Sequence, residues 1–223
     1  MLREIAHFVW NAPATLRLKA RLPQEQLYET LMDRADQAGL ADHRRALVAD
    51  LAGDVLELGS GTGRMFPHYG ADARVTAIEP DARFAALAEE PRRRAAGAIT
   101  TTIGSGEALP FDDARFDAAV VALVLCSVPS PAAVLGELRR VVRPGGQLRL
   151  IEHVRSHRAV AGWLMDRVDG AWLRLNAQGC HLNRDPLPEI RAAGFEVVRT
   201  APFQVYSAGL PAFPMRAITA TRT

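Results

Sequence analysis

The stretch VLELGSGTGR, at positions 55–64, constrains the fold of this chain more than any other part of the sequence. An apolar run leads into Gly59, Gly61 and Gly63, which stand at every second position. Glycine adopts backbone conformations that other residues avoid, and it lets a ligand lie directly on the main chain. The helix that follows such a turn offers free amide groups to a negatively charged group. The stretch therefore predicts a strand, a ligand-binding turn and a helix, which together open an α/β sheet.

Apolar segments of strand length recur along the chain and alternate with helical patterns. The predicted strands cover residues 54–58, 74–80, 98–103, 116–125, 147–154, 195–205 and 212–222. The predicted helices cover residues 24–38, 42–51, 158–176 and 187–193, and one more runs from Pro131, behind a Ser130 cap, to the RPGG turn at 143–146. The order of these elements predicts a doubly wound α/β fold.

Two segments indicate how the predicted sheet is arranged. The run FDAAVVALVL, at 116–125, is apolar on both faces, which is typical of a strand in the middle of a parallel sheet. The last two strands are joined by a loop that contains Gly209 and Pro211, so they are expected to pair antiparallel. We therefore predict a mostly parallel, seven-stranded sheet that ends in an antiparallel C-terminal pair.

Composition narrows the class of protein. The chain has 223 residues, of which 48% are apolar and 23% charged, and its net charge is +2. These values fit a soluble globular domain and argue against a nucleic-acid-binding surface. The two cysteines, Cys126 and Cys180, lie far apart in the sequence, which argues against a disulfide framework and against a zinc site. We expect no metal and a cytoplasmic location.

The N-terminal segment leaves two interpretations open. Residues 1–23 mix Phe8, Val9 and Trp10 with basic residues, and no part of the chain approaches the roughly 20 apolar residues that span a bilayer. The segment is expected to form a helical lid, or a helix that makes peripheral contact with a membrane surface. We therefore divide the chain into an N-terminal helical lid, 1–45, and a main domain, 46–223. The sequence predicts no oligomeric state.

The glycine spacing separates two classes of ligand. A dinucleotide fingerprint, G-x-G-x-x-G, requires a third glycine where this chain has Arg64. Glu79 ends the second predicted strand, 20 positions after Gly59, where a carboxylate accepts hydrogen bonds from both ribose hydroxyls of an adenosine. The glycine spacing alone leaves an NAD-dependent oxidoreductase as the alternative of another class, although Arg64 and the RPGG turn argue against it.

The longer set of motifs resembles the class I S-adenosylmethionine (SAM)-dependent methyltransferases. The matching pieces, in order, are VLELGSGTG, VTAIEP, GSGEALPF, FDAAVVALVLCSV and LRRVVRPGGQLRLIEHV. ALVLCSV, RPGG, EHV and the two tryptophans ahead of GCHLNR are most similar to the methyltransferase-like 7 group, whose animal members are thiol S-methyltransferases on intracellular membranes. That group has Asn where this chain has His181, and the core motifs also occur in UbiE-type quinone and phospholipid methyltransferases.

This resemblance implies a set of site residues. The expected cofactor-binding residues are Glu57, Gly59, Ser60, Gly61, Gly63, Glu79, Pro80, Ser105, Gly106, Glu107 and Leu123. Many relatives carry Asp at the position of Ser105, so Glu107 is a candidate replacement. The expected acceptor-binding residues are Cys126, Trp163, Trp172 and Arg184, where Arg184 either attracts an anion or pairs with Asp185 or Glu189.

Two histidines are the candidate general bases, since histidine is the side chain that most readily exchanges a proton near neutral pH. His153 ends the fifth predicted strand, and His181 lies in GCHLNR. We expect methyl transfer from SAM to a small-molecule acceptor. A thiol is the first choice, because a thiol with a pKa near 8.5 needs only modest help to ionise. A quinone, phenol or phospholipid headgroup is the alternative, and a non-catalytic SAM-binding protein is another.

Overall fold

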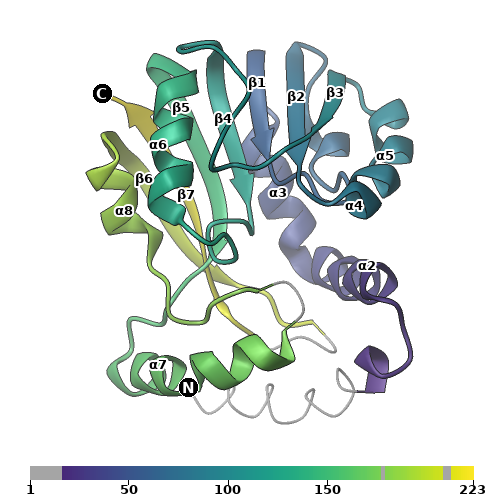
Figure 1. The fold of residues 1–223 in the computed structure, drawn as a ribbon, viewed down its shortest axis with the longest axis vertical. Coiled ribbons are helices and arrows are strands. Elements are labelled where there is room, and N and C mark those ends of the chain that lie inside the picture. The colour runs from purple at the N-terminus through teal and green to yellow at the C-terminus, as the bar shows by residue number, and fades with distance from the viewer. Residues whose placement is uncertain (1–16, 177–178, 208–211) are drawn as a thin grey trace.

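The computed structural model describes residues 17–176, 179–207 and 212–223. Its centre is one seven-stranded sheet with the strand order β3-β2-β1-β4-β5-β7-β6 (Figure 1). The first five strands of that order are parallel, and β7 pairs antiparallel with both β5 and β6. The predicted doubly wound sheet with an antiparallel C-terminal pair is therefore confirmed. The predicted loop with Gly209 and Pro211 lies outside the described residues.

The elements follow one another as strand and helix along most of the chain. The strands are β1 (Gly53–Leu58), β2 (Ala73–Glu79), β3 (Ala98–Ile103), β4 (Phe116–Ala122), β5 (Val142–His153), β6 (Phe195–Gln204) and β7 (Pro214–Arg222). The helices are α2 (Gln24–Ala35), α3 (Ala41–Val48), α4 (Ala82–Leu87), α5 (Glu89–Arg94), α6 (Pro131–Val141), α7 (Ala159–Leu175) and α8 (Pro186–Ala192), with short helical turns η1 (Asp36–Leu40) and η2 (Phe66–His68).

Two apolar layers hold the sheet between its helices. On one face, α6 and α8 pack on the side chains of the central strands, including Leu56, Val121 and Leu150. On the other face, α3 and η2 pack on alternate residues of the same strands, including Val55 and Val120. This alternation follows from the two-residue period of a strand, and burial of both faces explains the apolar runs that predicted the strands.

The structure corrects two predicted boundaries. The RPGG motif lies within the bounds of β5, which begins at Val142 rather than at 147. Phe116 pairs with Val142 and Ala118 with Gln147, so residues 143–146 form a bulge in β5, and regular pairing starts at Gln147 as predicted. The strand predicted for 116–125 stops at Ala122, because Leu123 takes a left-handed conformation with φ of 63°. The chain therefore leaves the sheet three residues earlier than predicted.

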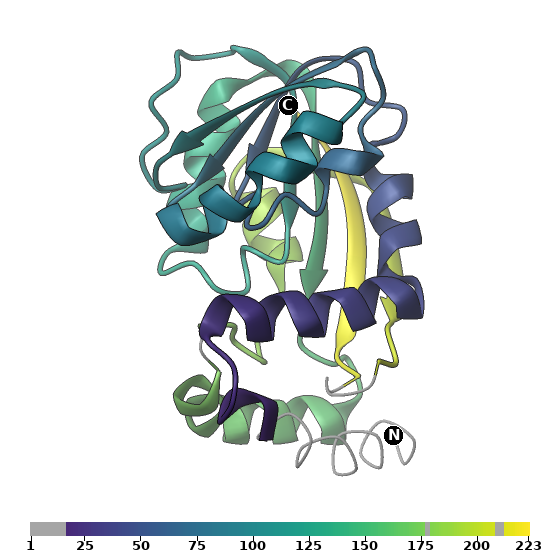
Figure 2. The same cartoon turned by 90° about the vertical axis from the view of Figure 1, so that its right-hand side faces the viewer.

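Two helices lie beyond the carboxyl ends of the parallel strands. Figure 2 shows α2 crossing below the strand ends, with α7 farther out on the same side. The N-cap of α2 is Pro23, and its buried residues are Leu27, Leu31 and Ala35, the face predicted from the sequence. In the described part of the chain, no helix combines the length and the apolar character needed to cross a bilayer.

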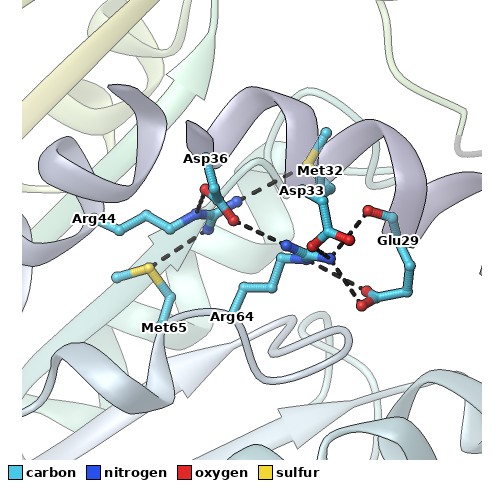
Figure 3. A network of polar contacts seen from close by, with 7 residues as sticks. All are labelled: Glu29, Met32, Asp33, Asp36, Arg44, Arg64 and Met65. Atoms are coloured by element: carbon cyan, nitrogen blue, oxygen red, sulfur yellow. Dashed lines mark hydrogen bonds and ion pairs between the residues drawn. The ribbon is translucent and has the colours of Figure 1, made fainter. Parts of the chain in front are cut away.

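A network of charges ties α2 to the glycine-rich turn. Arg64, at the end of the turn, pairs with Glu29, Asp33 and Asp36 at 2.8, 2.8 and 2.9 Å (Figure 3). Arg44 of α3 is buried and pairs with Asp36 as well, at 3.0 Å. The residue that departs from the dinucleotide fingerprint thus anchors α2 above the turn.

Candidate active site

The glycine-rich turn after β1 depends on its glycines. Gly59, Gly61 and Gly63 all have positive φ, of 67°, 55° and 79°. A Cβ atom at Gly59 would lie 2.5 Å from Cγ2 of Val124, and one at Gly63 would lie 2.8 Å from Cδ2 of Phe66. Residues other than glycine rarely adopt this backbone conformation, and a side chain at Gly59 or Gly63 would clash with its neighbours. A ligand can approach the bare backbone at this point.

Glu79 faces the same turn from the end of β2. Its Oε2 accepts a hydrogen bond from the Gly61 amide at 2.9 Å, and its Oε1 accepts one from the Asp81 amide at 3.0 Å. Burial raises the pKa of Glu79, and these two backbone hydrogen bonds oppose the rise. Each oxygen retains a second lone pair for ribose hydroxyls. Pro80 follows on the exposed side of the turn.

Two further expected cofactor residues, Ser60 and Glu57, lie deeper. Ser60 is buried, and its amide donates to Ile78 at 3.2 Å. Glu57 is 2% exposed, and burial raises its pKa to about 8, while the Tyr69 hydroxyl beside it lowers the pKa by less. Its Oε2 has no hydrogen-bond partner among the described residues. Glu57 is therefore mostly uncharged at neutral pH, in the floor below the turn.

The segment after β3 supplies a second polar edge. The Ser105 hydroxyl donates to Oε2 of Glu107, and the Glu107 amide donates to Ser105 at 3.2 Å. Oε1 of Glu107 is buried without a partner in the described residues. Between them, Gly106 packs closely on Leu58, whose Cδ1 would lie 3.0 Å from an added Cβ. The free acceptor thus belongs to Glu107, the candidate replacement for the missing Asp.

Glu152 fixes the loop that leaves β4. Its Oε1 accepts from the amides of Val124 and Leu125, both at 2.9 Å, and its Oε2 accepts from the amide of Cys126 at 3.2 Å. Glu152 is 1% exposed, and burial raises its pKa to about 7 against the lowering effect of these hydrogen bonds. Together with the left-handed Leu123, this carboxylate holds the loop between the glycine turn and β5.

The two cysteines meet at this loop, although 53 residues of sequence separate them. The His181 amide donates to the Cys126 carbonyl at 2.8 Å, so the two segments run side by side. Cys180 Sγ lies 3.5 Å from Nδ1 of His153. The hydrogen bond with the Cys126 thiol, together with His153 and His181, lowers the pKa of Cys180 to about 5 against the opposing effect of burial. The same hydrogen bond to Cys180, together with burial, raises the pKa of Cys126, and neither cysteine forms a disulfide.

Both candidate bases therefore come to one place, and each has a distinct environment. His153 is 4% exposed, and its Nε2 has no partner among the described residues. Nδ1 of His181 lies 2.9 Å from Oδ2 of Asp169, and the Leu182 amide donates to Oδ1 of Asp169 at 2.6 Å. The carboxylate orients the His181 ring, which leaves Nε2 to exchange a proton.

The expected acceptor-binding residues fall into different places. Nε1 of Trp172 donates to the Cys180 carbonyl at 2.9 Å, and the ring packs on Phe213 at 5.4 Å. Trp163 is 54% exposed and stacks with Arg167, so the structure does not bring it to the histidines. Nη1 of Arg184 donates to the carbonyls of Leu125 and Val128, both at 2.7 Å. No ion pair joins Arg184 to Asp185 or Glu189 in the described part of the chain.

Sequence reasoning missed two residues that shape the site. Glu152 was visible only as the neighbour of His153, and nothing in the sequence indicated that it binds three amides 26 to 28 positions earlier. Asp169 lies on a helix whose position relative to His181 depends on the tertiary fold. A carboxylate 12 residues before a candidate base was the only available signal.

The arrangement fits an adenosyl cofactor. The turn after β1 offers bare backbone where a Cβ at Gly59 or Gly63 would clash, and Glu79 offers lone pairs at the ribose position. Glu107 offers a buried oxygen without a partner among the described residues. The carboxyl edge of an open α/β sheet is the usual place for such a ligand. The histidines and cysteines lie at the same edge, beyond β4 and β5.

Curated methyltransferases are similar to part of this chain. Thiol S-methyltransferase TMT1B of Rattus norvegicus is 36% identical over 152 residues, which cover 65% of this chain and 61% of the rat protein. Thiol S-methyltransferase TMT1A of Homo sapiens is 32% identical over the same shares. The C-methyltransferase UbiE of Methylobacterium nodulans, which acts in ubiquinone and menaquinone biosynthesis, is 35% identical over 53% of this chain and 47% of that protein. The chain thus spans about 61% of the length of the thiol S-methyltransferases it matches.

Solved structures share the fold at low identity. A SAM-dependent methyltransferase from Methanosarcina mazei superposes with a TM-score of 0.62 at 22% identity, covering 77% of this chain and 92% of that chain. The [4+2]-cyclase SpnF superposes with a TM-score of 0.65 at 20% identity, covering 83% of this chain and 80% of that chain. The fold therefore does not decide the reaction by itself. Residues 56–150 match the family described as "Methyltransferase domain". With its glycine turn and Glu79, this part of the chain is similar to the class I SAM-dependent methyltransferases.

Proposed function

We propose that this protein transfers the methyl group of SAM to the sulfur atom of a small-molecule thiol. The observation that carries the proposal is that two histidines meet a sulfur atom at this edge of the sheet: Sγ of Cys180 lies 3.5 Å from Nδ1 of His153, and His181 follows Cys180 in the chain. In line with this, the Cys126 thiol, His153 and His181 lower the pKa of Cys180 to about 5. The same groups favour the ionised form of a substrate thiol, which is the reactive nucleophile.

His181 is the proposed general base. Asp169 holds its Nδ1, so its Nε2 is the nitrogen that accepts the thiol proton. The substrate sulfur then forms a bond to the methyl carbon as the bond from that carbon to the sulfonium sulfur breaks. A thioether and S-adenosylhomocysteine are the products. SAM supplies a methyl group that is already activated, so the protein mainly orients and ionises the acceptor.

The remaining residues position the reactants and exclude water. Glu152 fixes the three amides of the loop after Leu123, which keeps this loop against the glycine turn. Trp172 and Phe213 form an apolar wall beside His153, whose ring lies 4.5 Å from that of Phe213. Because a thiolate and a sulfonium neutralise each other as they react, a dry site favours the reaction.

The names of the relatives support a thiol as the methyl acceptor, and they also include the alternative, a quinone. The thiol S-methyltransferases match over more of this chain, 65%, than does the UbiE C-methyltransferase, at 53%. Transfer to the carbon or oxygen of a quinol or phenol would use the same cofactor edge. A phenol has a pKa near 10 and therefore depends more strongly on a base.

The test is release of S-adenosylhomocysteine from the purified protein with a panel of acceptors. The panel contains hydrogen sulfide, alkyl thiols, aryl thiols, catechols, quinols and phosphatidylethanolamine. We expect turnover with thiols only. Turnover with a quinol but with no thiol would replace the proposal by its alternative. If the protein binds SAM but forms no S-adenosylhomocysteine with any acceptor in the panel, it is a SAM-binding protein without this activity.

Substitution of each histidine separates binding from chemistry. His181→Ala and His153→Ala are both expected to lower turnover of a thiol while the affinity for SAM changes less than about twofold. A general base contributes about 100-fold or more to such a step. Unchanged turnover in His181→Ala would remove His181 from the proposed step.

A further inference from the structure

A large apolar pocket lies between α7 and the ends of β6 and β7. It encloses about 740 Å³, and its walls include Leu164, Met165, Val168, Trp172, Phe203 and Phe213. A volume of this size holds a drug-sized molecule, whereas one water molecule occupies only about 30 Å³. Hydrogen sulfide or a thiol of a few carbons would leave most of the pocket unfilled.

The pocket contains a buried cation that no carboxylate balances. Arg216 of β7 lines it and is 9% exposed. Its Nη1 donates to Thr200 at 3.3 Å, its Nη2 contacts Nε2 of His157, and its Nε has no partner among the residues that the structure describes. No acidic residue in the described part of the chain lies within ion-pair distance of this guanidinium or lines the pocket. Buried arginines are normally paired, because an isolated buried charge is costly.

The pocket adjoins the histidines and cysteines. Phe213 contacts the His153 ring at 4.5 Å and the Trp172 ring at 5.4 Å, so it separates the pocket from His153 by a single side chain. Trp172 also donates to the carbonyl of Cys180. Met215, which lines the pocket, is the register partner of His153 and the neighbour of Arg216. A molecule in this pocket therefore lies within one side chain, that of Phe213, of the proposed thiolate site.

We propose that the pocket binds the body of the methyl acceptor, and that this acceptor is amphipathic, with a long apolar chain or ring system and a carboxylate that pairs with Arg216. A carboxylate matches the planar guanidinium, and its oxygens supply the acceptor that Nε lacks. The position of the reacting sulfur rests on the proposed thiol methylation, whereas the pairing with Arg216 does not.

The first experiment measures binding without SAM. Parinaric acid, a fatty acid whose fluorescence rises in an apolar site, is bound and then displaced by undecanoate or by undecanol. We expect undecanoate to compete about 10- to 100-fold better, the range for a hydrogen-bonded charge pair. Arg216→Met is expected to abolish this preference, while Arg199→Met, an exposed position on neighbouring β6, retains it. Equal competition in the wild type, or a preference that survives Arg216→Met, would overturn the proposal.

A second variant covers the case in which Arg216→Met does not fold. Ala161→Trp fills the pocket from α7 and leaves Arg216 in place. Loss of parinaric acid binding with an unchanged affinity for SAM supports the pocket as the binding site. Undiminished binding places the fatty acid elsewhere and contradicts the proposal.

The second experiment compares turnover of mercaptoundecanoate, undecanethiol and ethanethiol. We expect kcat/KM to be highest for mercaptoundecanoate and to fall about tenfold or more in Arg216→Met, with ethanethiol unaffected. If kcat/KM is equal for ethanethiol and mercaptoundecanoate, thiol methylation is supported and the proposed role of the pocket is contradicted. If undecanoate binds through Arg216 but no thiol yields S-adenosylhomocysteine, the carboxylate site at Arg216 is supported and thiol methylation is contradicted.

Discussion

Oδ2 of Asp169 lies 2.9 Å from Nδ1 of His181, and this contact joins α7 to the segment that follows it. The other oxygen of the same carboxylate accepts from the Leu182 amide at 2.6 Å, so Asp169 holds both the ring and the backbone beside it. Asp169 is buried at 8% exposure. A carboxylate fixed in this way selects one tautomer of histidine and leaves the opposite nitrogen free for proton transfer.

Asp169→Asn is expected to lower kcat for a thiol about 10- to 100-fold, because the amide no longer selects the same tautomer and orientation of the His181 ring. The affinity for SAM and the KM for the thiol are expected to change less than about twofold. Steady-state kinetics and calorimetric titration with SAM check these values. The control is Asp166→Asn, an exposed carboxylate on the same helix that pairs with Arg155. An equal loss of kcat in both variants would show that α7 as a whole, and not Asp169, determines the rate.

Gly59→Ala is expected to abolish measurable SAM binding. The added Cβ would lie 2.5 Å from Val124 in a backbone conformation with φ of 67°, so the turn and the loop after β4 must both move. Gly136→Ala on α6 is the matched control, because nothing lies within 4 Å of its added Cβ. That control should keep full affinity and gain up to about 1 kcal/mol of stability. Wild-type affinity in Gly59→Ala would place the cofactor elsewhere.

The sequence predicted those parts of the fold that depend on local pattern. A strand buried on both faces must be apolar throughout, so runs such as FDAAVVALVL marked the strands of the sheet. The glycine turn was predictable because positive φ and close packing leave few other residues at those positions. The alternation of elements then predicted the doubly wound fold class, but not the order of the strands in the sheet. The RPGG motif marked the start of regular pairing at Gln147, but not the pairing of Val142 with Phe116 before it, because the motif forms a bulge inside β5.

The acceptor side was less predictable because it is made by tertiary contacts. Nothing local indicates that Cys126 meets Cys180, or that Asp169 meets His181, since each pair joins separate elements. Arg184 was expected to meet an anion, but its Nη1 donates to two backbone carbonyls of the loop after β4. Charge and residue type predict that an arginine needs a partner, whereas the fold decides which partner it finds.

Arg64→Met is expected to lower the free energy of unfolding by about 2 kcal/mol and to loosen α2. The substitution removes a side chain that is 13% exposed and pairs with Glu29, Asp33 and Asp36, which leaves three carboxylates close together. Denaturant unfolding and hydrogen exchange of the α2 amides measure these effects. Arg94→Met on α5 is the control, since its pair with Glu90 is exposed and contributes about 0 to 1 kcal/mol. Unchanged exchange in α2 would show that its apolar face alone holds the helix.

Glu57→Gln is expected to remove a pH dependence of stability in the protein without SAM. Burial raises the pKa of Glu57 from 4.5 to about 8, so in this window the folded protein keeps a proton that the unfolded chain releases. Stability from this group is complete below the lower value and is lost as pH rises towards the higher one, by about 1.4 kcal/mol per pH unit. Gln carries no such proton. The stability of the variant relative to the wild type should therefore increase between about pH 5 and about pH 8, as measured by denaturant unfolding.

Glu89→Gln is the control, because Arg92 lowers the pKa of Glu89 and its carboxylate stays ionised across that window. A difference between Glu57→Gln and the wild type that stays constant with pH would mean that Glu57 is ionised in the folded protein, and that its charge is balanced in the floor below the glycine turn.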